Sequence, residues 1–182
     1  MRRTFGVLAV AASLVATTAQ AQTAWQTEIG IQGGYSRLKP AGTGTNDQVD
    51  NFDIPGVTNN INGASHNALY FVLPWKNKIA LEPSVSFSSV VGAANQASVG
   101  LRADYALGRK AYAAGGAILG YLAAGSVATD YQLGLQAAVG YRLRITGRLN
   151  GRLEANWITT RGTDQIGPAN AYALLLGVST RL

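Results

Sequence analysis

Apolar and polar side chains alternate along most of the chain beyond its first 21 residues. In the segment 25–38, one parity carries the large apolar and aromatic side chains, and the other carries polar side chains and glycine. The first set consists of Trp25, Thr27, Ile29, Ile31, Gly33 and Tyr35. Because a strand sends successive side chains to opposite faces, this pattern predicts a β-strand with one apolar and one polar face.

The same alternation recurs in further segments of similar length. The predicted strands are 25–38, 65–75, 78–91, 96–108, 110–122, 131–145, 148–161 and 169–182. Their connections alternate between long and short, and the longest is the Gly- and Pro-containing segment 39–64, which we expect to be a polar loop. Long loops that alternate with short turns are typical of bacterial membrane barrels, in which the short turns face the periplasm. The sequence therefore predicts an all-β, eight-stranded antiparallel up-and-down transmembrane β-barrel.

The segment 111–128 departs from simple alternation, because it is uncharged and rich in Gly and Ala. Taken alone, it would also suit a transmembrane helix. A single helix among these strands would leave open strand edges in lipid, so a strand is favoured. Tyr112 and Tyr121 have opposite parity, which predicts a bulge near Gly115 and Gly116.

A proline interrupts the predicted strand 78–91. Pro83 cannot donate a ladder hydrogen bond, so a second bulge is expected at this position.

The first 21 residues have the order of parts found in a secretory signal peptide. Arg2 and Arg3 precede an apolar run over 5–16, and a small-residue cleavage site ends at Ala21. The run is short for a transmembrane helix. We expect the cleaved signal peptide to be 1–21 and the barrel domain to be 22–182.

Composition narrows the function classes. The chain has no cysteine, and its charged residues make up 13%, against about 25% in ordinary soluble domains. The net charge is +6, but the longest basic run is the pair Arg109 and Lys110. A basic stripe suited to nucleic acid is therefore absent from the sequence, and no nucleic-acid partner is expected.

Charged side chains of both signs occupy the polar parity of the predicted strands. The acids are Glu28, Glu82, Asp104 and Glu154, and the arginines are Arg102, Arg142, Arg144, Arg152 and Arg181. An eight-stranded barrel is just wide enough for its side chains to fill it, and isolated charges there would be very unfavourable. The sequence predicts that these groups pair into a network that plugs the interior; the alternative interpretation is an ion pathway.

Aromatic residues lie near the ends of the predicted strands, as in the two interfacial girdles of membrane barrels. The periplasmic set is Trp25, Trp75, Tyr105 and Tyr141, and the outer set is Tyr35, Phe87, Tyr131, Trp157 and Tyr172. Arg37, Lys39 and Arg161 are candidates for contacts with lipopolysaccharide phosphates at the outer rim, although they would also serve simple solubility.

Signals for catalysis and metal binding are weak. The single histidine, His66, follows Ser65, but a Ser-His dipeptide does not make a triad, whose roles depend on geometry. Asp47, Asp50 and Asp53 match no calcium-loop motif, and no zinc spacing, P-loop or dinucleotide fingerprint is present. We expect no catalytic residue, no metal and no cofactor.

The segment 28–35 (EIGIQGGY) and the closing segment 172–182 resemble the small bacterial outer-membrane β-barrel family that includes OmpA-like barrels and OmpX. The family's last strand usually ends in an aromatic residue that the assembly machinery reads, whereas this segment ends at Leu182. The resemblance implies an outer-membrane location, with contacts to membrane lipid, lipopolysaccharide and that machinery. Such barrels act as membrane-stabilising proteins, adhesins, resistance factors or narrow channels, and the fold does not determine which. We expect a non-enzymatic structural or surface-interaction role. A narrow pore for small solutes and a lipid-modifying enzyme remain the alternatives, and the residues indicate no oligomeric state.

Overall fold

The alternating segments of the sequence form strands that curl into a closed sheet. The computed structural model describes residues 25–40, 49–52, 68–90, 94–123, 130–161 and 168–182. Its elements are β1 (Glu28–Pro40), β2 (Val49–Phe52), β3 (Ala68–Lys76), β4 (Ile79–Val90), β5 (Ala94–Ala106), β6 (Ala111–Ala123), β7 (Asp130–Arg144), β8 (Leu149–Thr160) and β9 (Ala169–Arg181). The predicted signal peptide lies outside the described residues.

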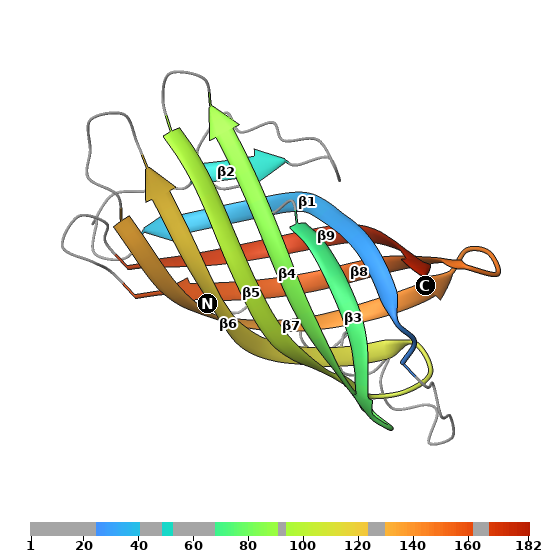
Figure 1. Cartoon of the computed structure of the whole chain (residues 1–182). Coiled ribbons are helices and arrows are strands. Elements are labelled where there is room, and N and C mark those ends of the chain that lie inside the picture. Colours follow the sequence, from blue (N-terminus) through green and yellow to red (C-terminus); the bar gives the residue numbers. More distant parts are fainter. Residues whose placement is uncertain (1–24, 41–48, 53–67, 91–93, 124–129, 162–167) are drawn as a thin grey trace, which may run out of the picture.

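The sheet closes because β1 and β9 pair along their full lengths, from Glu28 opposite Arg181 to Pro40 opposite Ala169. From β3 to β9, each strand pairs antiparallel with the next strand along the chain. Figure 1 shows the resulting up-and-down barrel, in which β1 lies against β9. The predicted eight-stranded antiparallel barrel is confirmed.

The two ends of the barrel differ in their connections. Tight turns at 77–78, 107–110 and 145–148 lie at one end, which we call the turn end, and the opposite end is the loop end. Leu182 lies at the turn end, where its backbone N–H donates to the carbonyl of Thr27 at 3.1 Å. In the part of the chain described, no helix is long and apolar enough to cross a membrane.

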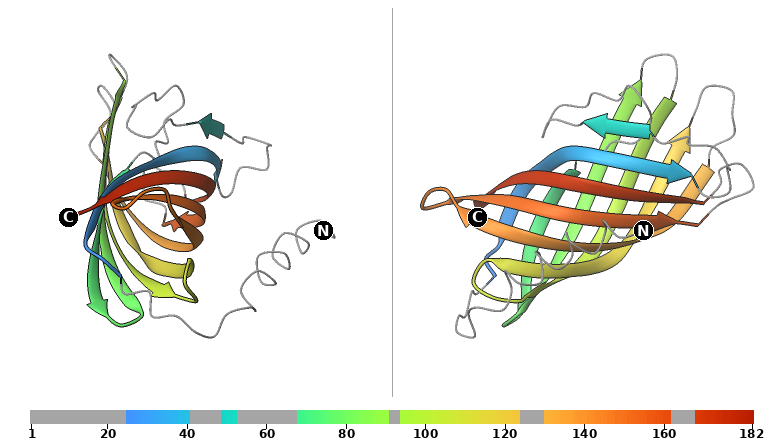
Figure 2. Two further views of the ribbon diagram at one scale, coloured as in Figure 1. Left: turned by 90° about the vertical axis from the view of Figure 1, so that its right-hand side faces the viewer. Right: turned by 180° about the vertical axis from the view of Figure 1, so that it is seen from behind.

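The predicted loop 39–64 contains an additional short strand. β3 pairs with β1 only from Glu28 to Gln32. β2 pairs with the next part of β1, from Tyr35 to Leu38, on the side where β3 no longer reaches it. Figure 2 shows β2 beside the far part of β1, near the loop end. Interpreting the whole segment as a loop was therefore wrong at 49–52, because an otherwise unpaired strand edge offers hydrogen-bonding groups to any nearby extended segment.

The predicted bulges lie elsewhere. β6 pairs without a register shift with both β5 and β7 through Gly115 and Gly116, so the bulge expected there is wrong. Tyr112 and Tyr121 have opposite parity simply because they lie on opposite faces of a regular strand. The β4–β5 ladder is also regular through Pro83, so the bulge expected there is wrong. A register shift lies instead in the β3–β4 hairpin, between Pro74 and Lys76.

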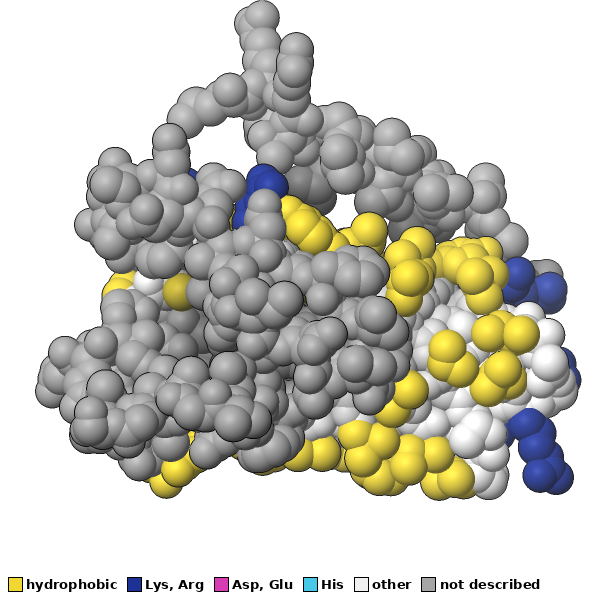
Figure 3. Space-filling view, turned by 90° about the horizontal axis from the view of Figure 1, so that it is seen from above, with side chains coloured by type: hydrophobic (Ala, Val, Ile, Leu, Met, Phe, Trp, Pro, Cys, Tyr) yellow, Lys and Arg dark blue, Asp and Glu magenta, His cyan; other side chains and the backbone are white. Residues whose placement is uncertain are grey.

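Side chains alternate between the barrel interior and the outer wall. Along β9, buried and exposed residues alternate strictly from Ala171 to Thr180. The large apolar side chains of the outer wall remain exposed, as with Val99 at 62%, Leu135 at 60% and Leu176 at 57%. Figure 3 shows hydrophobic side chains spread over the part of the wall that is visible in that view. An exposed apolar band around a closed sheet is what a lipid environment requires.

Candidate functional site

Five charged side chains meet inside the barrel, and we call them the central cluster. They are Glu82 on β4, Arg102 and Asp104 on β5, and Arg152 and Glu154 on β8. Each has the inward parity of its strand, and none is more than 6% exposed. Charged groups buried this deeply are stable only when they are paired and hydrogen-bonded.

Arg102 is the first hub of the central cluster. Its Nη1 and Nη2 donate to the two carboxylate oxygens of Glu154 at 2.8 and 2.7 Å, which is a bidentate pair. Nη2 also lies 3.0 Å from Oε1 of Glu82. Nε lies 2.9 Å from Oδ1 of Asp104, close enough for an ion pair but without the alignment of a hydrogen bond. Asp104 is therefore held by charge more than by directed bonds.

Arg152 is the second hub. Its Nη1 and Nη2 donate to Glu82 at 2.5 and 3.0 Å, and Nη2 also donates to the side-chain oxygen of Gln32. The same Nη2 lies 3.2 Å from Oε2 of Glu154. The guanidinium group stacks 4.1 Å from the ring centroid of Tyr70, within the range of a cation–π contact. Glu82 and Glu154 are thus shared between the two arginines, which links β4, β5 and β8 across the interior.

Two buried tyrosines lie against the central cluster, and two glycines provide space for them. The hydroxyl of Tyr112 donates to Oε2 of Glu154 at 2.6 Å. Tyr112 lies opposite Gly140 in the β6–β7 register, and Tyr70 lies opposite Gly30 in the β1–β3 register. A Cβ on Gly140 would lie 2.2 Å from the Tyr112 ring, and one on Gly30 would lie 2.4 Å from the Tyr70 ring. Each tyrosine ring therefore occupies the space left by the glycine opposite.

Sequence reasoning did not assign these tyrosines to the site. Tyr70 has the parity opposite to the apolar face of its strand, and Gln32, Asn150 and Ser179 also lie on polar faces. Parity alone could have placed all of them inside. The signal that was missed is a large aromatic residue on the inward parity, paired across the sheet with glycine.

The central cluster holds one carboxylate more than it has guanidinium groups. Three acids, Glu82, Asp104 and Glu154, face two arginines. Bidentate pairs and shared carboxylates tie five strand positions together, so the arrangement can close the interior to solute. It offers neither a nucleophile beside a base nor a metal-ligand set, and no group of His, Cys, Asp and Glu in the described segments could hold a metal ion.

A second, smaller group lies nearer the turn end. Glu28, which is 2% exposed, pairs with Nη2 of Arg142. Its two oxygens also accept hydrogen bonds from Nδ2 of Asn150 at 2.9 Å and from Oγ of Ser179 at 2.7 Å. The four predicted acids are thus divided between this group and the central cluster.

Two of the arginines predicted for the interior network lie at its mouth instead. Arg144 is exposed and Arg181 is half-buried, and neither forms an ion pair with the four acids among the residues described. They are the last residues of β7 and β9, so their inward parity directs them to the open end of the barrel and not to its enclosed length. The predicted network was wrong for these two residues.

Trp25 corrects the predicted aromatic girdle. It precedes the first residue of β1, so strand parity does not govern it, and the chain turns its ring into the barrel mouth. The side chain is 7% exposed, packs edge to face on Tyr112 at 5.9 Å, and lies under the guanidinium group of Arg142 at 4.8 Å. Other predicted girdle residues with described side chains lie on the outer wall: Tyr35, Trp75, Tyr105, Tyr131, Tyr141, Trp157 and Tyr172.

The remaining predicted residues lie at the loop end or outside the description. Arg37, Lys39 and Arg161 are exposed near the loop end. Phe87 lies in β4, but its side chain is outside the described set, as are Ser65 and His66. The arrangement of Ser65 and His66 is therefore not part of the described structure.

Comparison with known proteins gives a result for the fold. No protein-family model matches the chain, and a search of curated proteins finds no match. Among solved structures, Neisserial surface protein A (NspA) matches with a TM-score of 0.63 at 11% identity, over 86% of this chain and 97% of that one. The attachment invasion locus protein Ail of Yersinia pestis, in complex with the heparin analogue sucrose octasulfate, matches with a TM-score of 0.51 at 12% identity, over 87% and 99%.

The outer membrane protein OprG from Pseudomonas aeruginosa aligns over 90% of this chain and all of its own, with a TM-score of 0.41 at 12% identity. The similarity to NspA and Ail extends over nearly the whole length of each, so it concerns the complete barrel and not a shared hairpin. At these identities the similarity concerns architecture alone: this chain has the fold of the small outer-membrane β-barrels.

Proposed function

We propose that this protein is a non-enzymatic barrel of the bacterial outer membrane, with a plugged interior and a membrane-structural or surface-interaction role. Residues 1–21 act as the cleaved export signal, and 22–182 form the barrel domain. The observation that carries the proposal is the central cluster, in which Arg102 and Arg152 share Glu82 and Glu154 at exposures of 6% or less. Shared, directed ion pairs in a narrow barrel favour a packed polar core over a water-filled path.

The membrane location is supported by the outer wall. Its exposed apolar side chains surround a closed sheet, and aromatic side chains lie near both ends, as with Trp75 at the turn end and Tyr172 toward the loop end. Both features match the lipid-facing band and girdles of outer-membrane barrels. Cell fractionation should recover the mature protein with outer-membrane markers, and recovery with soluble periplasmic proteins would contradict the proposal.

Conductance through planar bilayers tests the plug. Refolded wild-type protein is expected to give no steady conductance, because the central cluster spans the interior from β4 to β8. Arg152→Ala serves as the comparison, since it empties a volume at the hub and removes one of the two arginines that Glu82 and Glu154 share, so intermittent conductance is expected. Steady, ion-selective conductance by the wild type would replace the plug with the narrow-pore function.

Lipopolysaccharide is the proposed partner at the loop end. The exposed cations Lys39 and Arg161 lie at the rim where outer-leaflet phosphates would be met, and charge-assisted bonds to phosphate are strong. Replacing both with Gln should weaken co-purification with lipopolysaccharide. Replacing Lys78 and Arg148 together with Gln, which removes two exposed cations at the turn end, is the matched control. Equal retention by all three proteins would argue against this partner.

A further inference from the structure

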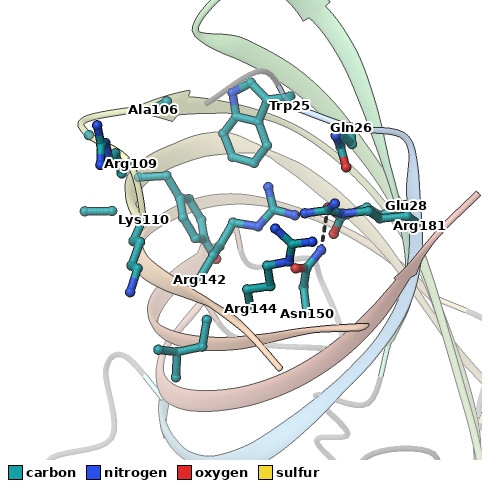
Figure 4. A pocket seen from close by; sticks show the side chains of 14 residues that line it. Trp25, Gln26, Glu28, Ala106, Arg109, Lys110, Arg142, Arg144, Asn150 and Arg181 are labelled. Carbon is teal, nitrogen blue, oxygen red and sulfur yellow. Dashed lines mark hydrogen bonds and ion pairs between the residues drawn. The ribbon is translucent and has the colours of Figure 1, made fainter. Parts of the chain in front are cut away.

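A cavity opens at the turn end, in the mouth of the barrel. Its volume is about 460 Å³, and the indole ring of Trp25 forms part of its wall. Figure 4 shows three arginines from two strands reaching into it: Arg142 and Arg144 from β7 and Arg181 from β9. The volume lies within the range of small-molecule sites, which is about 300–1,000 Å³.

The lining of this cavity carries excess positive charge. Glu28 is the carboxylate that lines it, and the carboxylate oxygens are already bonded to Arg142, Asn150 and Ser179. The three arginines therefore exceed the acid by two positive charges, before the rim residues Arg109 and Lys110 are counted. Like charges gathered in a partly enclosed space repel one another, and an anion between them would relieve that repulsion.

Arg144 and Arg181 also have unused hydrogen-bonding capacity. Nε of Arg144 donates to the carbonyl of Thr146 at 3.3 Å, and Nε of Arg181 is buried with no hydrogen-bond partner. Within the described segments, neither guanidinium group has a carboxylate partner. A guanidinium group presents five N–H donors in a planar fork that matches the oxygens of phosphate.

We propose that this cavity is a binding site for a phosphate-bearing anion, held mainly by Arg144 and Arg181 with Trp25 as one wall. A phosphate monoester carries about −1.5 to −2 charges at neutral pH, which balances the excess of two positive charges. The site is distinct from the central cluster, because neither arginine belongs to that cluster. The phosphate monoester can be a soluble one or the headgroup of phosphatidic acid at the membrane surface beside the turn end.

Calorimetric titration of the full chain in maltoside micelles with sodium pyrophosphate tests the site. The wild type is expected to bind saturably, and Arg144→Gln and Arg181→Gln should each weaken binding about tenfold or more, as expected for lost charge-assisted bonds. Lys78→Gln is the control, because Lys78 is an exposed cation at the turn end that does not line the cavity. Its affinity should match that of the wild type.

Two results would overturn the proposal: no saturable binding by the wild type, or equal weakening by Lys78→Gln and Arg144→Gln, which would indicate diffuse attraction to net charge. Arg144 is exposed, so Arg144→Gln decides the question even if Arg181→Gln does not refold. The source of the phosphate is separated in lipid nanodiscs. Weaker pyrophosphate binding in nanodiscs with phosphatidic acid than in nanodiscs given equal negative charge by cholesteryl hemisuccinate, which has no phosphate, would support the headgroup as occupant, and equal binding would support a soluble ester.

Discussion

The excess carboxylate of the central cluster leads to a prediction that simple pairing would not give. Glu154→Gln and Asp104→Asn each remove one negative charge from a side chain that is at most 1% exposed. Each substitution leaves the cluster with two acids and two arginines. If net charge alone determined stability, the two variants would behave alike.

Their contacts predict very different outcomes. Glu154 accepts two hydrogen bonds from Arg102 and one from Tyr112, and it also pairs with Arg152. A glutamine would direct an NH₂ group at donors already on Arg102, leaving buried donors unsatisfied. Breaking a buried pair in this way typically costs about 3–5 kcal/mol, so we expect Glu154→Gln to lower the free energy of unfolding by about 3 kcal/mol.

Asp104 has much less to lose. Its Oδ1 lies 2.9 Å from Nε of Arg102 without hydrogen-bond alignment. Asparagine keeps the size of the side chain and removes repulsion from the two neighbouring carboxylates. We therefore expect Asp104→Asn to change stability by about 1 kcal/mol or less, in either direction.

Urea unfolding in phospholipid vesicles, followed by tryptophan fluorescence, measures both variants on one scale. The midpoint should fall for Glu154→Gln and remain close to wild type for Asp104→Asn, with similar slopes for all three proteins. Equal losses of stability, or a larger loss for Asp104→Asn, would refute the reasoning that directed contacts determine the contribution of each acid.

Three further predictions concern the wall, the interior packing and the topology. Leu135→Arg should impair membrane insertion, since a cation on the lipid face near the midplane costs about 2–4 kcal/mol. Gln136 points inward, so Gln136→Ser should fold nearly as the wild type does. Equal tolerance of both substitutions would mean that the assignment of inward and outward side chains is wrong. Gly140→Ala should destabilise by about 1–3 kcal/mol, because its Cβ would lie 2.2 Å from a tyrosine ring, and Gly120→Ala, with 3.6 Å to its nearest neighbour, should be nearly neutral in the same unfolding assay. Protease added to intact cells should cut within 39–64, outside β2, because the sequence predicts this segment to be an extracellular loop. Cutting only after the outer membrane is permeabilised would reverse the topology.

Strand positions and facing could be predicted because they depend on local geometry. A period of two follows from the pleat itself, so the side chains of Arg102 and Glu154, 52 residues apart, could be assigned to one interior before any pairing was known. Which charge meets which could not be predicted, because it depends on the stagger of eight strands around the barrel. That the central cluster holds one acid more than it has arginines, with Asp104 the least bonded of the three, likewise depends on the stagger and could not be predicted.

The errors have physical causes of the same kind. Trp25 precedes β1, where the alternation no longer applies, and Arg144 and Arg181 have the expected parity but lie too close to the strand ends to be enclosed. β2 forms in a segment with no alternation, because it pairs with a part of β1 that β3 leaves without a partner. Strand parity predicts whether a side chain points inward or outward. How far that side chain lies from the barrel mouth depends on the register of the strands.

The glycine–tyrosine pairs have a consequence for assembly. A hairpin that slipped by two residues would preserve every lipid-facing position, so the membrane cannot distinguish it from the native hairpin. Such a slip would set Tyr112 against Ala138 or Arg142 in place of Gly140, where a Cβ already occupies the space. The fit of each ring over a glycine therefore favours the native register over a two-residue slip, which the pattern of lipid-facing side chains alone would not do.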